Sequence, residues 1–185
     1  MSAWLALFLG LTLLQRAAEL FLSARNTRRV RALGGVEHGA GHFPLLVLVH
    51  VLWPVALVAE VVALGTGPGP LWPAWLGLWL GAQALRYLTI RALGGRWTVR
   101  ILVIPGMPLV RRGPYRWMAH PNYVAVAIEL IAGSLLFGAW RTAAGISLVN
   151  LVALSIRIQV EEAALAGAGG AGAPSQRPRR SRASQ

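Results

Sequence analysis

The sequence contains no cysteine and no lysine, and only six of its 185 residues are acidic. The absence of cysteine excludes disulfides, thiolate metal ligands and a cysteine nucleophile, and it leaves the redox compartment open. Arginine therefore supplies all 18 basic residues and a formal net charge of +12. Only 13% of the residues are charged, against about 25% in soluble domains. This composition indicates a membrane protein.

Several catalytic and binding patterns are also missing. The sequence has no HExxH zinc motif and no GxSxG nucleophile elbow. The string GxGxxG occurs only in the tail, at residues 167–172, where no predicted strand precedes it, so it is not a dinucleotide fingerprint. We also find no paired carboxylate-histidine set of the kind that such motifs use. A metal site is therefore unsupported, and any chemistry has to come from another arrangement of residues.

Five apolar stretches are long enough, or nearly so, to cross a hydrocarbon layer, which takes about 20 helical residues. The first lacks a basic leading segment and a clear cleavage site, so we interpret it as a retained helix rather than a signal peptide. The sequence predicts an all-α polytopic membrane protein with about five transmembrane helices, at residues 3–22, 43–64, 71–90, 123–137 and 142–160.

The arginines are distributed unevenly between these stretches. They cluster after the first stretch, between the third and the fourth, and in the tail, whereas residues 65–70 carry no charge. The positive-inside rule then places the basic segments and the C-terminus in the cytoplasm and the N-terminus outside. The use of arginine without lysine fits a GC-rich bacterial genome, so the membrane we expect is a bacterial plasma membrane. This distribution favours contact with anionic membrane lipids over nucleic acid. Tryptophans would mark the outer interface, namely Trp4, Trp72, Trp75 and Trp140.

Three parts follow from this layout. Residues 1–92 form a three-helix transmembrane part, residues 93–166 a catalytic part, and residues 167–185 a disordered basic tail, since Gly, Ala, Pro, Ser and Arg cannot bury a core. Gly138 and Trp140 allow a tight turn between the last two helices. That hairpin would bring His120 and Glu161 together, although they lie about 40 residues apart in the sequence.

Ionisable residues at membrane depth are candidates for a functional site. Arg16 and Glu19 lie three apart on one helical face, and Arg86 could meet Glu19 at similar depth or extend to the interface. Glu60 lies toward the outer end of its helix and is left out of the site. Glu129 lies about 12 Å above Pro121 at 1.5 Å per residue, and both a catalytic role and structural hydrogen bonding remain open for it.

The segment RRGPYRWMAHPNY, residues 111–123, joins two apolar runs and is basic, aromatic and rich in helix-breaking residues. Pro121 suits the first turn of a helix, which leaves His120 at the mouth of the hairpin as a cap or a ligand contact. Arg157 and Glu161 share a helical face, so they could form an ordinary ion pair. A carboxylate at this mouth would equally suit a sulfonium or an α-amino group.

GPYRWMAHPNY, followed one hairpin later by RIQVEE, resembles the isoprenylcysteine carboxyl methyltransferase family, related to phospholipid methyltransferases, over residues 96–165. The resemblance implies a membrane methyltransferase that uses S-adenosylmethionine and takes a lipophilic small-molecule substrate from the bilayer. Arg157 would be the substrate-side arginine, and we add Glu129 as a second catalytic candidate. One departure is Ala119, where the family usually has arginine. The implied cofactor contacts are Arg100, Met107, Pro108, Leu109, Val110, Tyr115, His120, Pro121, Asn122, Tyr123 and Glu161.

The methyl acceptor suggested by these residues is a carboxylate or enol of a lipophilic molecule, such as an isoprenoid or polyketide lipid. Such an acceptor is anionic near neutral pH, so positioning and electrostatics can do most of the work without a strong base. Two alternatives stay open: an NADPH-dependent membrane reductase, because sterol reductases have a similar fold, and a non-enzymatic membrane protein. The sequence does not indicate an oligomeric state.

Overall fold

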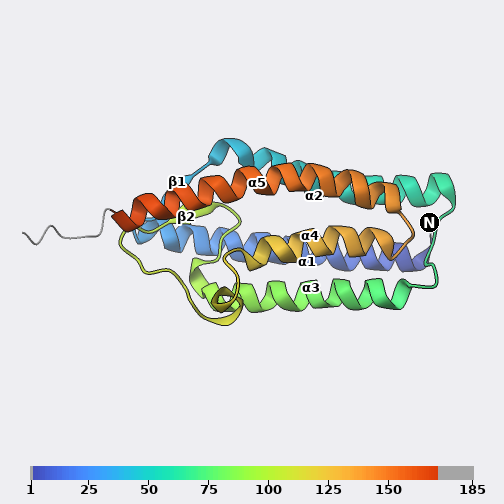
Figure 1. Ribbon diagram of the computed structural model, residues 1–185, viewed down its shortest axis with the longest axis horizontal. Helices are drawn as coiled ribbons and strands as arrows, with labels where there is room; N and C mark the ends of the chain where they lie inside the picture. The colour runs from blue at the N-terminus through green and yellow to red at the C-terminus, as the bar shows by residue number, and fades with distance from the viewer. Residues whose placement is uncertain (1, 171–185) are drawn as a thin grey trace, which may run out of the picture.

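The computed structural model describes residues 2–170, which form five long helices running side by side (Figure 1). This architecture confirms the all-α fold class. Each predicted apolar stretch corresponds to one helix, and short 3-10 turns lie at Ala40–His42 (η1), Gly94–Arg96 (η2) and Gly113–Arg116 (η3). The helices are α1 (Ala3–Ala32), α2 (Phe43–Leu64), α3 (Trp72–Leu93), α4 (Pro121–Leu135) and α5 (Trp140–Gly170).

Two helices extend beyond the apolar stretches that predicted them. α1 continues through its arginine-rich end to Ala32, since basic side chains in a last turn interact favourably with the helix dipole. α5 continues through the alanine-rich segment to Gly170, so residues 167–170, which we had assigned to the disordered tail, are helical. The rest of the predicted tail lies outside the described residues.

Among the described residues, three helical segments are long and apolar enough to cross a membrane: Ala3–Ala32, Ala40–Leu64 and Trp140–Ala168. α4 is apolar but has only 15 residues, and α3 carries the polar Gln83 and Arg86. The chain is therefore a membrane protein, while a count of five spans and the orientation remain predictions. The start of α1, the α2–α3 connection and the α4–α5 turn share one end of the bundle (Figure 1).

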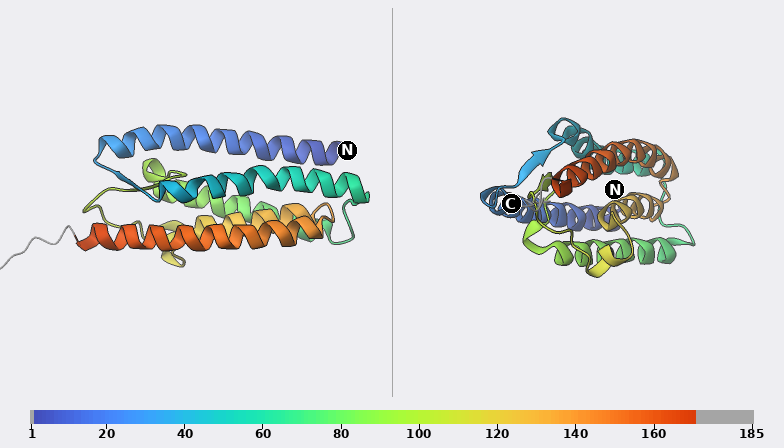
Figure 2. Two further views of the ribbon diagram at one scale, coloured as in Figure 1. Left: turned by 90° about the horizontal axis from the view of Figure 1, so that it is seen from above. Right: turned by 60° about the vertical axis from the view of Figure 1, so that its left-hand side comes forward.

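The helices pack in the pairs α3–α4, α4–α5 and α2–α5, and α1 lies across the bundle from α5 (Figure 2). Small residues let α2 approach α4: a Cβ on Gly133 would lie 2.8 Å from Cζ2 of Trp53. The Trp53 indole nitrogen donates a hydrogen bond of 2.9 Å to the hydroxyl of the next residue, Ser134. Close packing and this bond fix the height of α4 against α2.

Glu60 caps the N-terminus of α5 from the end of α2. Its carboxylate accepts hydrogen bonds from the backbone N–H groups of Arg141 (3.1 Å) and Thr142 (2.6 Å). First-turn N–H groups have no partner within their own helix, and the positive end of the helix dipole favours a carboxylate there. This structural role agrees with leaving Glu60 out of the functional site.

We expect Glu60→Ala to destabilise the protein by about 1–3 kcal/mol, because two helix N-terminal N–H groups lose their acceptor and the one on Thr142 is buried. The measurement is the free energy of unfolding from a denaturant titration in detergent micelles. Arg141→Ala is the matched control, since Glu60 binds the backbone of that residue and the backbone remains. Equal stabilities of Glu60→Ala and the unaltered protein would contradict the capping role.

A short antiparallel sheet, absent from our prediction, pairs β1 (Val36–His38) with β2 (Ile101–Val103). Val36 is opposite Val103 and His38 is opposite Ile101. Three-residue strands are too short to show a period in the sequence. The sheet joins the α1–α2 connection to the α3–α4 connection at the end of the bundle where α5 ends (Figure 1).

Candidate functional site

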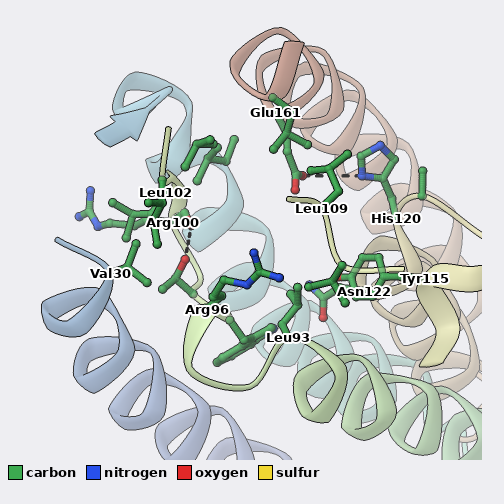
Figure 3. Close-up of a pocket in the computed structure, with 18 of the residues that line it drawn as sticks. Val30, Leu93, Arg96, Arg100, Leu102, Leu109, Tyr115, His120, Asn122 and Glu161 are labelled. Carbon is green, nitrogen blue, oxygen red and sulfur yellow. Dashed lines mark hydrogen bonds and ion pairs between the residues drawn. The ribbon is translucent and has the colours of Figure 1, made fainter. Parts of the chain in front are cut away.

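A cavity of about 310 Å³ lies beside this sheet, where α3 ends, α4 begins and α5 ends (Figure 3). Segment 93–110 supplies most of its apolar wall and also Arg96, Thr98 and Arg100. The other polar groups come from η3, the start of α4 and the end of α5. Most of the residues predicted as cofactor contacts line it, namely Arg100, Met107, Leu109, Val110, Tyr115, His120, Asn122, Tyr123 and Glu161, together with Arg157.

The connection between α3 and α4 is held against α3 by two local features. The Arg112 Nε donates a hydrogen bond of 2.9 Å to the carbonyl oxygen of Ala92. Gly113 has φ +58°, and a Cβ there would lie 3.1 Å from the Cβ of Ala92. A glycine is required because the backbone is left-handed and passes close to the helix. This anchoring positions η3, and with it Tyr115, at the cavity.

Three side chains form a connected polar wall across the α4–α5 hairpin. Arg157 donates from Nε to the Tyr123 hydroxyl at 2.8 Å, and the hydroxyl donates in turn to the Glu161 carboxylate. The Nη2 of Arg157 donates to the carbonyl oxygen of Val99 at 2.6 Å. Tyr123 therefore stands between the two charged groups, whereas the sequence had suggested a direct pair of Arg157 and Glu161.

His120 lies beside this wall, as the hairpin predicted. Its Nδ1 is 3.7 Å from Oε2 of Glu161, its Nε2 is 3.2 Å from Oε1 of Glu162, and its ring is stacked on Tyr123. His120 occupies the N-cap position of α4 but makes no side-chain capping hydrogen bond. The capping alternative is therefore not what the structure has, and the imidazole faces the carboxylates at the cavity.

Two neutral polar groups complete the cavity near His120. The pKa of Tyr115 is raised, first by burial and then by the negative charge of Glu161, so its hydroxyl stays protonated at neutral pH. The Asn122 Oδ1 is buried and has no hydrogen-bond partner among the described residues. A buried acceptor without a donor is costly, so a ligand that brings an N–H group would satisfy it.

The two arginine side chains of the apolar wall, Arg96 and Arg100, point in directions that we did not expect. Arg100 lines the cavity, but its guanidinium pairs with Glu37 at 2.5 Å and lies over the ring of Phe43, so it points away (Figure 3). The bond from Arg100 is the main cause of a lowered pKa of the Glu37 carboxyl. Arg96, which we had not assigned to the site, extends its guanidinium into the cavity instead (Figure 3).

Three predicted site residues do not line the cavity. Pro108 lies outside the lining, and its carbonyl oxygen accepts a hydrogen bond of 2.9 Å from Nη1 of Arg96. Pro121 is buried in the first turn of α4. Glu129 lies deeper along α4, away from the lining residues. The lining residues that the sequence did not suggest are Val30, Leu93, Arg96, Trp97, Thr98, Ile101, Leu102, Val103, Ile104, Ala119, Glu162 and Leu165. Arg96 had one available signal, its position in the basic connection that carries the motif.

Glu129 belongs to a separate buried cluster of two arginines and two glutamates. Arg86 and Arg16 donate to its two oxygens at 2.5 Å and 2.8 Å, and both arginines also contact Glu19, at 3.3 Å and 2.7 Å. The pairings of Arg16 and Arg86 with Glu19 agree with our predictions. Because both carboxylate oxygens of Glu129 are occupied, these contacts favour the structural alternative for Glu129 over the catalytic one.

Comparison with known proteins agrees with the motif reading. The sequence matches the Isoprenylcysteine carboxyl methyltransferase (ICMT) family over residues 75–167, which includes the cavity's polar wall. It is 38% identical over 159 residues to YpbQ, an uncharacterized protein of Bacillus subtilis, covering 86% of this chain and 95% of that protein.

A second relative, an uncharacterized protein of Haemophilus influenzae, is 27% identical over 151 residues, covering 81% of this chain and 88% of the relative. No solved structure gives a significant match. The family match covers α4, most of α3 and all but the end of α5, which contribute to the cavity, and the alignment with YpbQ covers most of both chains. The chain is therefore a member of the ICMT family of membrane methyltransferases.

Proposed function

We propose that this protein is an S-adenosylmethionine-dependent methyltransferase that methylates a carboxylate or enolate oxygen of a lipophilic small molecule. The observation that carries the proposal is the wall formed by Arg157, Tyr123 and Glu161, which presents a cation and an anion to one cavity. The Arg157 cation suits an anionic methyl acceptor, and the Glu161 anion suits a positively charged cofactor.

The residues present fit the cofactor. Glu161 offers a carboxylate, and the buried Asn122 Oδ1 offers an acceptor without a partner. Both suit the α-amino group or the sulfonium of S-adenosylmethionine. The remaining wall is largely apolar, as binding sites for small molecules usually are.

Bound S-adenosylmethionine supplies a methyl group attached to a positively charged sulfur. Within the chain, Arg157 is oriented by the Tyr123 hydroxyl and by the carbonyl oxygen of Val99. Its Nη1 makes no hydrogen bond to the described residues, so it can hold an anionic oxygen. Because such an oxygen is already deprotonated, His120 serves as a contact beside two carboxylates rather than as a general base.

The basic segments suggest which way the cavity faces. The end of the bundle that carries it holds the arginine-rich end of α1 and the connection between α3 and α4. By the positive-inside rule this end is cytoplasmic, where S-adenosylmethionine is made available. The acceptor would then reach the cavity from the surrounding lipid.

The test is equilibrium binding to the purified protein in detergent, with S-adenosylmethionine, S-adenosylhomocysteine and NADPH compared side by side by calorimetry. We expect saturable binding of the first two ligands and none of NADPH. The 2′-phosphate of NADPH requires a cluster of arginines, whereas Arg100 is paired with Glu37 and only Arg96 on this wall is left without a carboxylate partner among the described residues. Binding of NADPH without S-adenosylmethionine would replace the proposal with the reductase.

A second measurement addresses the atom that is methylated. Membranes containing the protein are incubated with S-adenosylmethionine labelled in its methyl group, and the label is followed into the organic phase. Label released by mild alkali indicates a methyl ester, as proposed. Label that resists alkali in every extracted product would contradict carboxylate methylation.

A further inference from the structure

We infer that Arg96 binds the α-carboxylate of S-adenosylmethionine and so sets the direction in which the cofactor lies in the cavity. This inference rests on the proposed function and adds a residue that neither the motifs nor the family pattern indicated. It concerns a segment outside the GPY, HPNY and glutamate motifs, at the end of η2.

The three arginines that line the cavity have different partners. Arg100 is paired with Glu37, and Arg157 is bonded to Tyr123 and Val99. Arg96 forms no ion pair with any described carboxylate, and its one hydrogen bond runs from Nη1 to the carbonyl oxygen of Pro108. Neither Arg96 nor Arg157 pairs with a described carboxylate, but Arg157 is held by two hydrogen bonds, whereas Arg96 has only one and keeps most of its donors free.

The direction of this side chain supports the same role. Its guanidinium extends across the cavity toward the wall that carries Tyr115 and Asn122 (Figure 3). Glu161 lines the cavity from α5, and its carboxylate points toward His120 (Figure 3). A positive group, a free carbonyl acceptor and a carboxylate thus share one enclosure. An amino acid zwitterion needs this combination: a donor pair for its carboxylate, and acceptors for its ammonium group.

Ala119 offers a second position from which a guanidinium could enter the cavity. Ala119 lines the same cavity, and its short side chain leaves room where the usual family pattern has arginine. Arg96 lines the same cavity from the segment that follows α3. Ala119 is an exposed residue of the cavity lining, and an arginine side chain introduced there is long enough to extend into the cavity.

The experiment compares two ligands that differ only in the carboxylate: S-adenosylhomocysteine and decarboxylated S-adenosylhomocysteine. The unaltered protein is expected to bind the first more tightly. Arg96→Gln is expected to weaken binding of S-adenosylhomocysteine about tenfold to a hundredfold and to leave the decarboxylated ligand within about twofold. Arg91→Gln, which removes the same charge from an exposed position on α3, should change neither affinity.

The comparison separates the possible failures. An equal loss for both ligands, or no loss, would overturn the assignment of Arg96 while leaving the proposed function intact. Failure of the unaltered protein to bind S-adenosylhomocysteine would count against both. If Arg96→Gln is not monodisperse in detergent, Arg96→Lys keeps the charge but not the paired donors, and it should lose part of the preference for the carboxylate.

A rescue variant gives an independent readout. In Arg96→Gln combined with Ala119→Arg, the guanidinium returns from the other wall. We expect the preference for S-adenosylhomocysteine over its decarboxylated form to recover in part. Recovery of stability without recovery of that preference would contradict carboxylate binding.

Discussion

Glu161→Gln is expected to weaken binding of S-adenosylmethionine about tenfold to a hundredfold, the range for losing a charged hydrogen-bond partner. The substitution keeps the size of the side chain and its acceptor for the Tyr123 hydroxyl, but it removes the negative charge from the cavity. Calorimetric titration in detergent measures the effect. Because the cavity wall is preserved, the melting temperature should change little.

Glu162→Gln is the matched control for this experiment. Glu162 follows Glu161 on α5 and contacts His120, but 63% of its side chain is exposed, compared with 29% for Glu161. Solvent screens an exposed carboxylate, so its loss should weaken binding only a few-fold. Equal effects of the two substitutions would argue against a specific role of Glu161.

The largest effect on stability is expected from Arg86→Met, at about 3–5 kcal/mol. Arg86 and Glu129 are both buried, and removal of the arginine leaves Glu129 with Arg16 as its remaining cation. The cluster then has two carboxylates, Glu19 and Glu129, and one guanidinium, so one negative charge is uncompensated in a low-dielectric environment. The free energy of unfolding in detergent, compared with that of the unaltered protein, measures the loss.

The double variant Arg86→Met with Glu129→Met tests both the network and the catalytic alternative for Glu129. It removes one positive and one negative charge together and leaves Arg16 paired with Glu19 at 2.7 Å. Most of the lost stability should return, since a buried pair replaced by apolar side chains is often neutral. Methyl transfer by this variant would exclude a catalytic role of Glu129, and a stable but inactive variant would support one.

The helices were predictable from the sequence because a membrane restricts the possible structures. In lipid the backbone must satisfy its own hydrogen bonds, so long apolar runs become helices. The short connection at Gly138 and Trp140 then required α4 and α5 to be antiparallel, which brought His120 beside Glu161. Arg16 and Glu19 were within one turn of the same helix, so their contact was a local property.

The polar connections were less predictable, because their geometry depends on partners far away in the sequence. The sheet exists because two three-residue strands, separated by the whole of α2 and α3, meet at the same end of the bundle. Arg100 matched the family pattern, yet Glu37 on the facing strand draws its guanidinium out of the cavity. Arg96 has no such partner and points inward.

By itself, then, the sequence determined an arginine-rich membrane protein with five helices and a motif-bearing connection before its final hairpin. Hydropathy and local spacing carry that information, because both are patterns among residues of a single helix and do not depend on distant partners. Only the tertiary structure decided that Tyr123 joins Arg157 to Glu161, that Glu129 belongs to a buried ion cluster, and that Arg96 enters the cavity. Long charged side chains can turn toward several neighbours, and the partner that packing brings closest determines their direction.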